Sequence, residues 1–102
     1  MQDQIFRKFF LGFVQIHILH HAKKEAFYGS WMIEELREHG YDMSPGTLYP
    51  LLQKMETSGL LQKEEKNVEG KIRKYYAITA LGSDVLMEAQ KKAYELFQEI
   101  KE

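Results

Sequence analysis

The sequence has 102 residues, which is enough for one hydrophobic core and leaves little room for a second. It contains no cysteine, so disulfides, thiolate metal sites and a cysteine nucleophile are excluded, and a reducing, cytoplasmic location is the natural expectation. The longest stretch without a charged residue, 9–22, is too short to span a bilayer, so we expect no signal peptide and no membrane segment. The net charge of −1 does not favour nucleic-acid binding, so the distribution of the charges matters more than their sum.

The first part of the chain predicts a long helix, from Gln4 to about Lys23, with one broad apolar face. That face consists of Ile5, Phe6, Phe9, Phe10, Phe13, Ile16 and Leu19. Ordinary core packing is one interpretation of the four phenylalanines. We favour a second interpretation, in which at least two of these rings pack against another subunit, because a single small core can cover only a limited number of apolar faces.

Three histidines, His17, His20 and His21, follow on this helix at i, i+3 and i+4. Such spacing can bind Zn²⁺ or a similar ion if further ligands complete the shell. However, no cysteine and no obvious fourth ligand accompanies them. The alternative is that they are partly buried, hydrogen-bonded polar residues at the end of an apolar helix. We therefore expect no metal and no cofactor, with these histidines as the only metal candidates.

A second helix follows a short connection at Ala26–Gly29 and should stop near His39-Gly40. Its apolar stripe consists of Trp31, Met32, Ile33 and Leu36. This helix would be the first of a helix-turn-helix pair, in which it crosses over the backbone of the duplex.

Residues 44–58 predict a third helix with an apolar inner face. Ser44 offers a hydroxyl to cap free backbone N–H groups, and Pro45 has a φ near the helical value. The inner stripe recurs at i, i+3, i+4 and i+7 as Leu48, Leu51, Leu52 and Met55. The opposite face carries Thr47, Pro50, Gln53 and Lys54. Ser58-Gly59 suits a left-handed C-terminal end.

Pro50 leaves two alternatives for the start of this helix. If the helix starts at Pro45, Pro50 lies past the first turn and removes a hydrogen bond to the Gly46 carbonyl, where the missing side chain limits crowding. If Thr47 is the cap, Pro50 lies in the first turn. Both alternatives keep the same leucine and methionine stripe on the inner face.

Two strands follow, Leu60-Leu61 and Lys71–Ile78, with a turn at Val68-Glu69-Gly70. Residues 44–79 carry six Lys and Arg against four Asp and Glu, whereas 1–43 and 80–102 are net acidic. Within 66–74, Glu69 is the only acidic residue beside four cations, Lys66, Lys71, Arg73 and Lys74. A helix with a polar outer face and a hairpin with a cationic tip is the layout of a winged helix-turn-helix, and such a local patch suffices for phosphate contacts.

From Ala80 the chain predicts a helix that continues to the end. Its residues Leu86, Ala89, Ala93, Leu96 and Ile100 are spaced 3, 4, 3 and 4, which is a heptad seam that Val85 and Phe97 widen. Such a helix could lie on its own domain, but the small alanines would let another helix approach closely. We predict a two-fold homodimer made by this helix and the N-terminal one. The interface would contain Phe6, Phe9, Phe10, Phe13, Leu86, Ala89, Ala93, Leu96, Phe97 and Ile100.

Several segments, in this order, resemble the PadR-like transcriptional regulators. They are the run Ser-Pro-Gly-Thr-Leu-Tyr-Pro-Leu-Leu at 44–52, then Met55-Glu56, Gly59-Leu60-Leu61, the run Gly-Lys-Ile-Arg-Lys-Tyr-Tyr at 70–76, Thr79 and Gly82. Tyr28-Gly29, with Ile33 and Leu36 after it, fits the preceding helix of the family, and the resemblance covers roughly 13–86. It implies a homodimeric winged-helix regulator, usually a repressor, in a short form with a single C-terminal dimerisation helix.

The expected fold is therefore mainly α with a small two-stranded β-wing. It is a winged helix-turn-helix in one domain, 1–102, with the DNA-binding part in 1–79 and the dimerisation helix in 80–102. Contacts with a palindromic operator in double-stranded DNA would come from the third helix and the wing. The expected contact residues are Ser44, Gly46, Thr47, Tyr49, Gln53, Lys54, Lys66, Lys71, Arg73 and Lys74. For Ser44 and Tyr49 the alternative roles are a simple cap and packing on the wing.

A small-molecule effector of unknown identity would release the repressor. Some PadR-like proteins bind flat aromatic compounds at the dimer centre, and Tyr94 and Phe97 could line such a cavity, although closed aromatic packing is the other interpretation. No enzyme constellation is present, because Ser44 and Ser58 have no histidine near them in sequence and Gly70-Lys71 lacks the rest of a phosphate loop. The alternative function is a winged-helix module that docks proteins without reading DNA.

Overall fold

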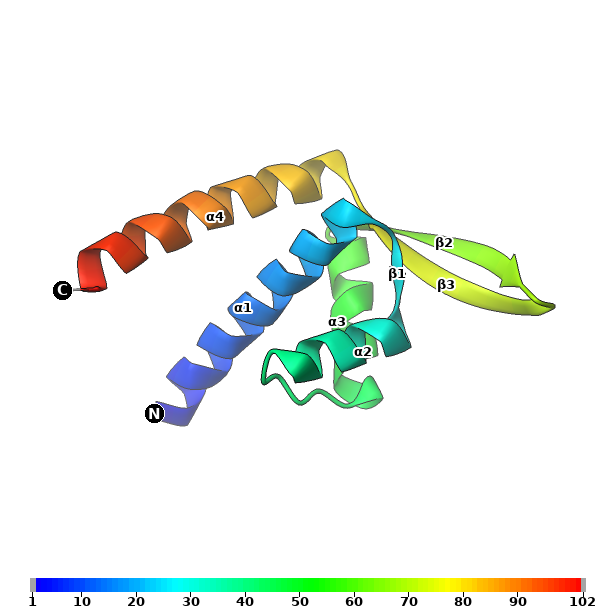
Figure 1. The fold of residues 1–102 in the computed structure, drawn as a ribbon, viewed down its shortest axis with the longest axis horizontal. Coiled ribbons are helices and arrows are strands. Elements are labelled where there is room, and N and C mark those ends of the chain that lie inside the picture. The colour runs from blue at the N-terminus through cyan, green and yellow to red at the C-terminus, as the bar shows by residue number, and fades with distance from the viewer. Residues whose placement is uncertain (1, 102) are drawn as a thin grey trace.

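The computed structural model describes residues 2–101 as four helices and a three-stranded antiparallel sheet (Figure 1). In chain order these are α1 (Gln2–Lys24), β1 (Phe27–Tyr28), α2 (Gly29–Glu38), α3 (Pro45–Thr57), β2 (Leu61–Val68), β3 (Lys71–Ile78) and α4 (Ala80–Ile100). This is the predicted, mainly helical winged helix-turn-helix. None of the helices within 2–101 combines the length and the apolarity that a bilayer-spanning segment requires.

The sheet has one strand more than expected. The segment predicted as a plain connection at Ala26–Gly29 contains β1, and the strand order is β1-β3-β2. Phe27 is paired with Tyr76 and Tyr28 with Tyr75. Two residues are too few to show an alternation of apolar and polar side chains. The strand forms because β3, which lies far along the chain, pairs with it.

The core lies where the second half of α1, α2, α3 and the base of the sheet meet (Figure 1). Its buried side chains are Val14, Ile18, Leu19, Ala22, Phe27, Met32, Ile33, Leu36, Met43, Leu48, Leu52, Met55, Leu61 and Tyr76. The predicted stripes of α2 and α3 are thus confirmed, with Leu51 half-buried at the edge. Trp31 is the exception, because its side chain is 39% exposed and lies outside the core.

The core covers the apolar face predicted for α1 only toward the C-terminal end of the helix, where Leu19 is buried and Ile16 is half-buried. The core takes Val14, Ile18, Leu19 and Ala22 from this helix, whereas Ile5 and the four phenylalanines are 39–68% exposed. The phenylalanines instead contact one another, with the Phe9 and Phe13 ring centroids 4.4 Å apart. The first half of α1 therefore leaves a cluster of aromatic rings uncovered by its own chain.

Helix α3 begins at Pro45, which excludes Thr47 as its cap and leaves Pro50 inside the helix. The Ser44 side chain does not cap a backbone N–H group, contrary to expectation; its hydroxyl lies 3.2 Å from the Thr47 hydroxyl instead. The C-terminal end agrees with the prediction. Gly59 has a φ of 84°, and the N–H groups of Gly59 and Leu60 donate to the carbonyls of Glu56 and Met55.

The wing is longer than the sequence indicated. Strand β2 runs over Leu61–Val68, not Leu60-Leu61, and pairs along its whole length with β3. Only Leu61 of β2 is buried, so the strand is stabilised by its ladder and not by an apolar face. The turn at Glu69 and Gly70 has φ values of 54° and 83°, which is the two-residue turn that matches the twist of a hairpin.

Helix α4 starts at a tight junction with the end of α3. Thr79 caps the helix by accepting a hydrogen bond from the Gly82 N–H at 2.9 Å, and its hydroxyl donates to the Gly59 carbonyl. Gly82 is buried, and a Cβ at this position would collide with the Leu60 carbonyl oxygen. From this junction α4 diverges from α1, so the two helices form a V in Figure 1 that opens toward their free ends.

Candidate nucleic-acid interface

The outer face of α3 presents a row of polar side chains to solvent. Ser44, Gly46, Thr47, Gln53 and Lys54 are all exposed. Leu48, Leu52 and Met55 fix this orientation, because they are at most 2% exposed on the opposite side of the helix. The N-terminal end of α3 and its polar face are therefore free to enter a groove.

Tyr49 combines an exposed edge with a packing role that the sequence did not show. Its side chain is 43% exposed, and the ring lies against the backbone of Gly29 at the start of α2. A Cβ on Gly29 would lie 2.6 Å from Tyr49 Oη, so only glycine admits the ring at this distance. Tyr49 thus packs on the start of α2. Gly29 is a residue of this site that sequence reasoning missed.

The cations of the wing are divided between its two faces. Directly opposed residues of an antiparallel ladder point to the same side, and neighbours along a strand alternate. Arg73 is opposite Lys66, whereas Lys74 is opposite Glu65 on the other face. The face of Lys74 continues to α3, because Lys63 on that face forms a 3.7 Å ion pair with Glu56.

Two of the three cations on the first face lie over aromatic rings, and the third is Lys71. Arg73 Cζ is 4.3 Å from the ring centroid of Tyr28, and Lys66 Nζ is 4.9 Å from that of Tyr75. Such contacts contribute only about 0.5–1 kcal/mol at exposed positions. They nevertheless limit the directions in which the charges can point, and both side chains remain exposed to solvent.

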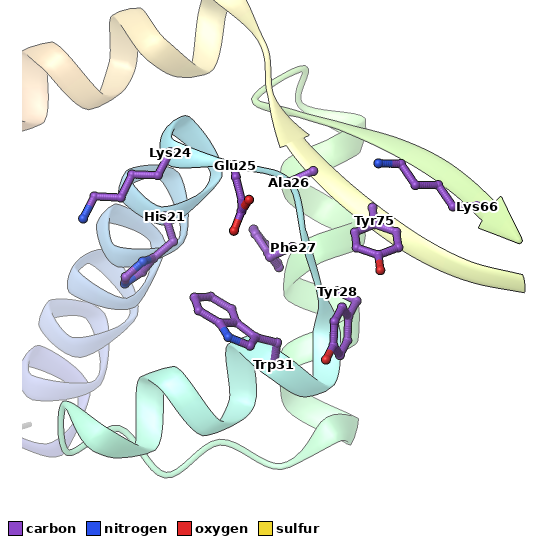
Figure 2. A pocket seen from close by; sticks show the side chains of 9 residues that line it. All are labelled: His21, Lys24, Glu25, Ala26, Phe27, Tyr28, Trp31, Lys66 and Tyr75. Carbon is purple, nitrogen blue, oxygen red and sulfur yellow. The ribbon is translucent and has the colours of Figure 1, made fainter. Parts of the chain in front are cut away.

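A cavity of about 740 Å³ opens between this face of the wing, β1, the end of α1 and the start of α2 (Figure 2). Trp31, Tyr28 and Tyr75 line it with aromatic rings, and Lys24 and Lys66 contribute cations. The cavity was not among the sequence predictions, because its walls come from four separate segments.

Most of the residues predicted for a dimer interface are exposed along α1 and α4, whereas Leu86 and Ala89 are half-buried. On α4, Leu96, Phe97 and Ile100 are 54%, 59% and 65% exposed. Tyr94 is 66% exposed, so Tyr94 and Phe97 form no closed aromatic core within one chain. Nearer the junction, Phe13, Ala89 and Ala93 line a hollow of about 440 Å³ between the two helices, next to the half-buried Leu86.

The three histidines predicted as metal candidates are separated by the fold. His20 is exposed and lines the hollow beside α4, as His17 also does, whereas the ring nitrogens of His17 and His21 converge toward the end of α2. There they meet His39, which the sequence reading did not include. Burial lowers the pKa of both His17 and His21, so these two imidazoles are neutral at neutral pH.

Comparison with known proteins agrees with this arrangement. The sequence model of the transcriptional regulator PadR-like family matches residues 18–88. The chain is similar to the transcriptional regulator Rv3488 of Mycobacterium tuberculosis, at 43% identity over 94 residues that cover 92% of this chain and 88% of that protein.

Two solved structures are similar over nearly the full length. One is a PadR-like transcriptional regulator from Bacillus cereus, with a TM-score of 0.84 and 29% identity, covering 92% of this chain and 93% of that chain. The other is a PadR family transcriptional regulator from Eggerthella lenta, with a TM-score of 0.76 and 31% identity, covering 98% and 92%. These relatives are regulators and not enzymes, and the chain belongs to the PadR-like family of transcriptional regulators.

Proposed function

We propose that the protein is a homodimeric repressor in the cytoplasm, which binds a palindromic operator in double-stranded DNA and is released by an effector. The observation that carries this proposal is the exposed polar face of α3 beside a hairpin with cations on both faces. In helix-turn-helix proteins the second helix of the pair enters the major groove and the flanking elements bind phosphates. Here α3 has that position, with α2 as the preceding helix.

Within α3 we assign the groups by their reach. Thr47 can offer a hydroxyl or a methyl group to a base edge, and Gly46 lets the backbone approach the DNA closely. Gln53 and Lys54 lie further along the same exposed face. The Ser44 hydroxyl, which does not cap the backbone, is available to a phosphate.

Within the wing, Lys74 lies on the face that continues to α3, and Lys71 lies next to the turn. We assign these two cations to phosphates beside the groove that α3 occupies. Arg73 and Lys66 lie with Lys71 on the opposite face but further from the turn, and would contact the backbone only if the wing inserts into the minor groove. The wing therefore supplies sequence-independent, salt-sensitive affinity.

The homodimer rests on the uncovered apolar surface of α1 and α4. A seam with Leu96 and Ile100 more than half exposed needs a partner, and a second copy of the same seam is self-complementary under two-fold symmetry. The hollow lined by Phe13, Ala89 and Ala93 would receive side chains of the partner. Two copies of α3 would then face the two halves of a palindrome.

The cavity in Figure 2 is the place that we assign to a small-molecule effector. Its aromatic walls suit a flat ligand, and Lys24 and Lys66 outnumber Glu25, the acidic residue of the lining, which favours a ligand with negative charge. Lys66 and Tyr28, which line the cavity, also take part in the cation–π contacts of the wing. A ligand in the cavity would therefore compete with the contact between Tyr28 and Arg73.

The alternative function is a protein-docking module without sequence-specific DNA binding, which the net charge of −1 favours. The two are separated by selecting duplexes from a random-sequence pool with the purified protein. A repressor enriches an inverted repeat, and its affinity for that duplex falls steeply between about 50 and about 200 mM salt. If no sequence is enriched and all duplexes bind equally weakly, the docking module is the better account.

Two conservative variants test the recognition helix on the selected duplex. Thr47→Val keeps the shape and deletes the hydroxyl, so discrimination against a single mismatched base should fall by roughly 1–3 kcal/mol if Thr47 contacts that base. Tyr49→Phe should weaken operator binding at unchanged stability if the hydroxyl contacts a phosphate. If both variants bind operator and mismatched DNA as the parent does, α3 is not the recognition helix.

A further inference from the structure

Two pairs of potential metal ligands converge where α1 crosses α2. His17 and His21 lie at i and i+4 on α1, and Glu35 and His39 lie at i and i+4 at the end of α2. The nearest ring nitrogens of the three histidines all lie within 4.8 Å of one another. Glu35 Oε2 lies 2.9 Å from His39 Nε2 and 3.7 Å from His21 Nε2. Four side chains from two helices therefore share one point.

The donor set matches a divalent late transition metal. Imidazole nitrogens and carboxylate oxygens are ligands of Zn²⁺, and a tetrahedral ion takes four of them. Two nitrogens on one Zn²⁺ stand about 3.3 Å apart, given bonds of about 2.0–2.1 Å. Rotation of these side chains would be enough to close the observed spacing to that value, because His39 is 45% exposed and free to adjust.

The surroundings of the cluster are apolar and leave one nitrogen without a partner. The Trp31 ring is 5.5 Å from that of His21, and the Tyr41 ring is 5.4 Å from that of His17. His21 Nε2 is buried and accepts or donates no hydrogen bond within the described part of the chain. A buried polar atom without a partner is unfavourable, and a bound ion would supply that partner. These rings limit the access of water on their side of the cluster, whereas the exposed His39 leaves it open to solvent at its own position.

We propose that His17, His21 and His39, with Glu35 as the fourth ligand, bind a divalent late transition-metal ion such as Zn²⁺. His20 takes no part, since it is exposed and its ring nitrogens are not among those that converge. The spacing on α1 predicted His17 and His21 as candidates, but not Glu35 and His39, because these two lie on another helix. Of the three histidines that the sequence suggested, the set keeps two and leaves out His20.

A bound ion would fix α1 against α2. The effect on DNA binding rests on the proposed function. The ion would connect α1, which carries the exposed phenylalanines, to α2, the first helix of the DNA-binding pair. Metal would then alter the spacing or rigidity of the two DNA-binding parts in the dimer, and so the affinity for the operator.

The test is a titration of the untagged, chelator-treated protein with Co²⁺, followed by competition with Zn²⁺. Tetrahedral Co²⁺ gives intense visible absorption bands that octahedral Co²⁺ in water lacks. We expect these bands to saturate at one ion per chain and to disappear on addition of Zn²⁺. His39→Ala should weaken binding by at least about 100-fold, because even the loss of an outer-shell partner costs on the order of 10- to 100-fold.

The fourth histidine of the chain supplies the matched control. His20→Ala, one residue from His21 on the same helix, should bind the ion as the parent does. Glu35→Gln should weaken binding by about 10-fold or more and shift the bands, since an amide replaces the carboxylate. Far-UV circular dichroism without metal checks that each variant is folded.

The proposal is overturned if the parent shows no tetrahedral bands, if His39→Ala binds as tightly as the parent, or if His20→Ala loses as much affinity as His39→Ala. These spectra are recorded without DNA, so they remain decisive if the operator experiment fails. Operator binding with and without Zn²⁺ is measured separately, and no effect there would limit the ion to a structural role.

Discussion

Helices α3 and α4 carry apolar stripes of similar regularity, but only one of them is covered. In α3, Leu48 and Leu52 are 0% exposed, whereas in α4 Leu96 and Ile100 are 54% and 65% exposed. Gly82 is the buried residue of α4, at its first turn. The comparison shows that a hydrophobic period predicts that a face will be covered and does not say by which chain. Within residues 2–101, α2, α1 and the sheet cover α3, and nothing covers the far half of α4.

The largest effect is expected from charges placed on the open seam. Leu96→Asp combined with Ile100→Asp would bury unpaired carboxylates in the proposed interface, at a cost of roughly 3–5 kcal/mol. Light scattering and sedimentation should then show a folded monomer at concentrations at which the parent is a dimer. Met87→Asp, an exposed apolar position on the other side of α4, is the control and should leave the dimer intact. A double variant that still dimerises with the parent's affinity would remove α4 from the interface.

The same truncation in the two stripes should differ in its dependence on protein concentration. Leu52→Ala removes a fully buried side chain and should lower the free energy of unfolding by about 2–5 kcal/mol. Because the lost contacts are within one chain, this loss should be the same at all concentrations. Leu96→Ala should destabilise the protein at concentrations at which the parent is a dimer, and should have little effect at low concentration, where both proteins are monomers and this side chain is exposed. Denaturant unfolding over a range of concentrations measures both, and a concentration-independent Leu96→Ala effect would place this side chain in an intramolecular contact.

A smaller effect tests how firmly α3 is held on α2. Gly29→Ala places a methyl group 2.6 Å from Tyr49 Oη and should cost about 1–3 kcal/mol of stability. Combined with Tyr49→Ala, which removes the ring, the glycine substitution should cost much less. Thermal unfolding of the two single variants and the double variant gives the coupling energy. Additive effects would contradict the close packing of these two residues.

The smallest effect separates the two faces of the wing. Lys74→Ala should weaken binding to all duplexes and reduce the slope of the logarithm of affinity against the logarithm of salt by about one. Arg73→Ala, on the opposite face and over Tyr28, should change the slope less. Anisotropy titrations at several salt concentrations measure both slopes. If Arg73→Ala reduces the slope more than Lys74→Ala does, the wing contacts DNA with its other face.

Features set by local chemistry could be predicted from the sequence. Gly40 and Gly59, with φ values of 89° and 84°, end α2 and α3 as expected, and Glu69-Gly70 forms the hairpin turn. The inner stripes of α2 and α3 follow from their periodicity. Each of these depends on residues within one or two turns of the chain, which is the range over which a sequence pattern determines structure.

Features that depend on distant partners could not be predicted. Strand β1 exists because β3 pairs with it, and β2 is exposed except at Leu61 and charged over half its length, so neither carries an apolar period. The same limit applies to the site, where the contact of Tyr49 with Gly29 joins two helices. On α1 the large phenylalanines determined the predicted apolar face, although the smaller Val14 and Ala22 face the core. The hydrophobicity of an apolar side chain increases with its size, whereas a close crossing of two helices favours small side chains.

The junction at Thr79 and Gly82 would determine the distance between the two recognition helices of the proposed dimer. A helix of 21 residues is about 30 Å long, so a turn of about 5° at this junction moves its far end by about 3 Å. Half-sites on DNA recur at about 34–36 Å, a distance that two recognition helices must match. The Leu60 carbonyl, pressed against Gly82, and the Thr79 hydroxyl, bonded at once to α3's end and α4's start, leave little freedom for such a turn. The junction would thus hold α4 at a fixed angle to the DNA-binding part. A side chain larger than glycine at position 82 would change that angle, and with it the length of operator that fits.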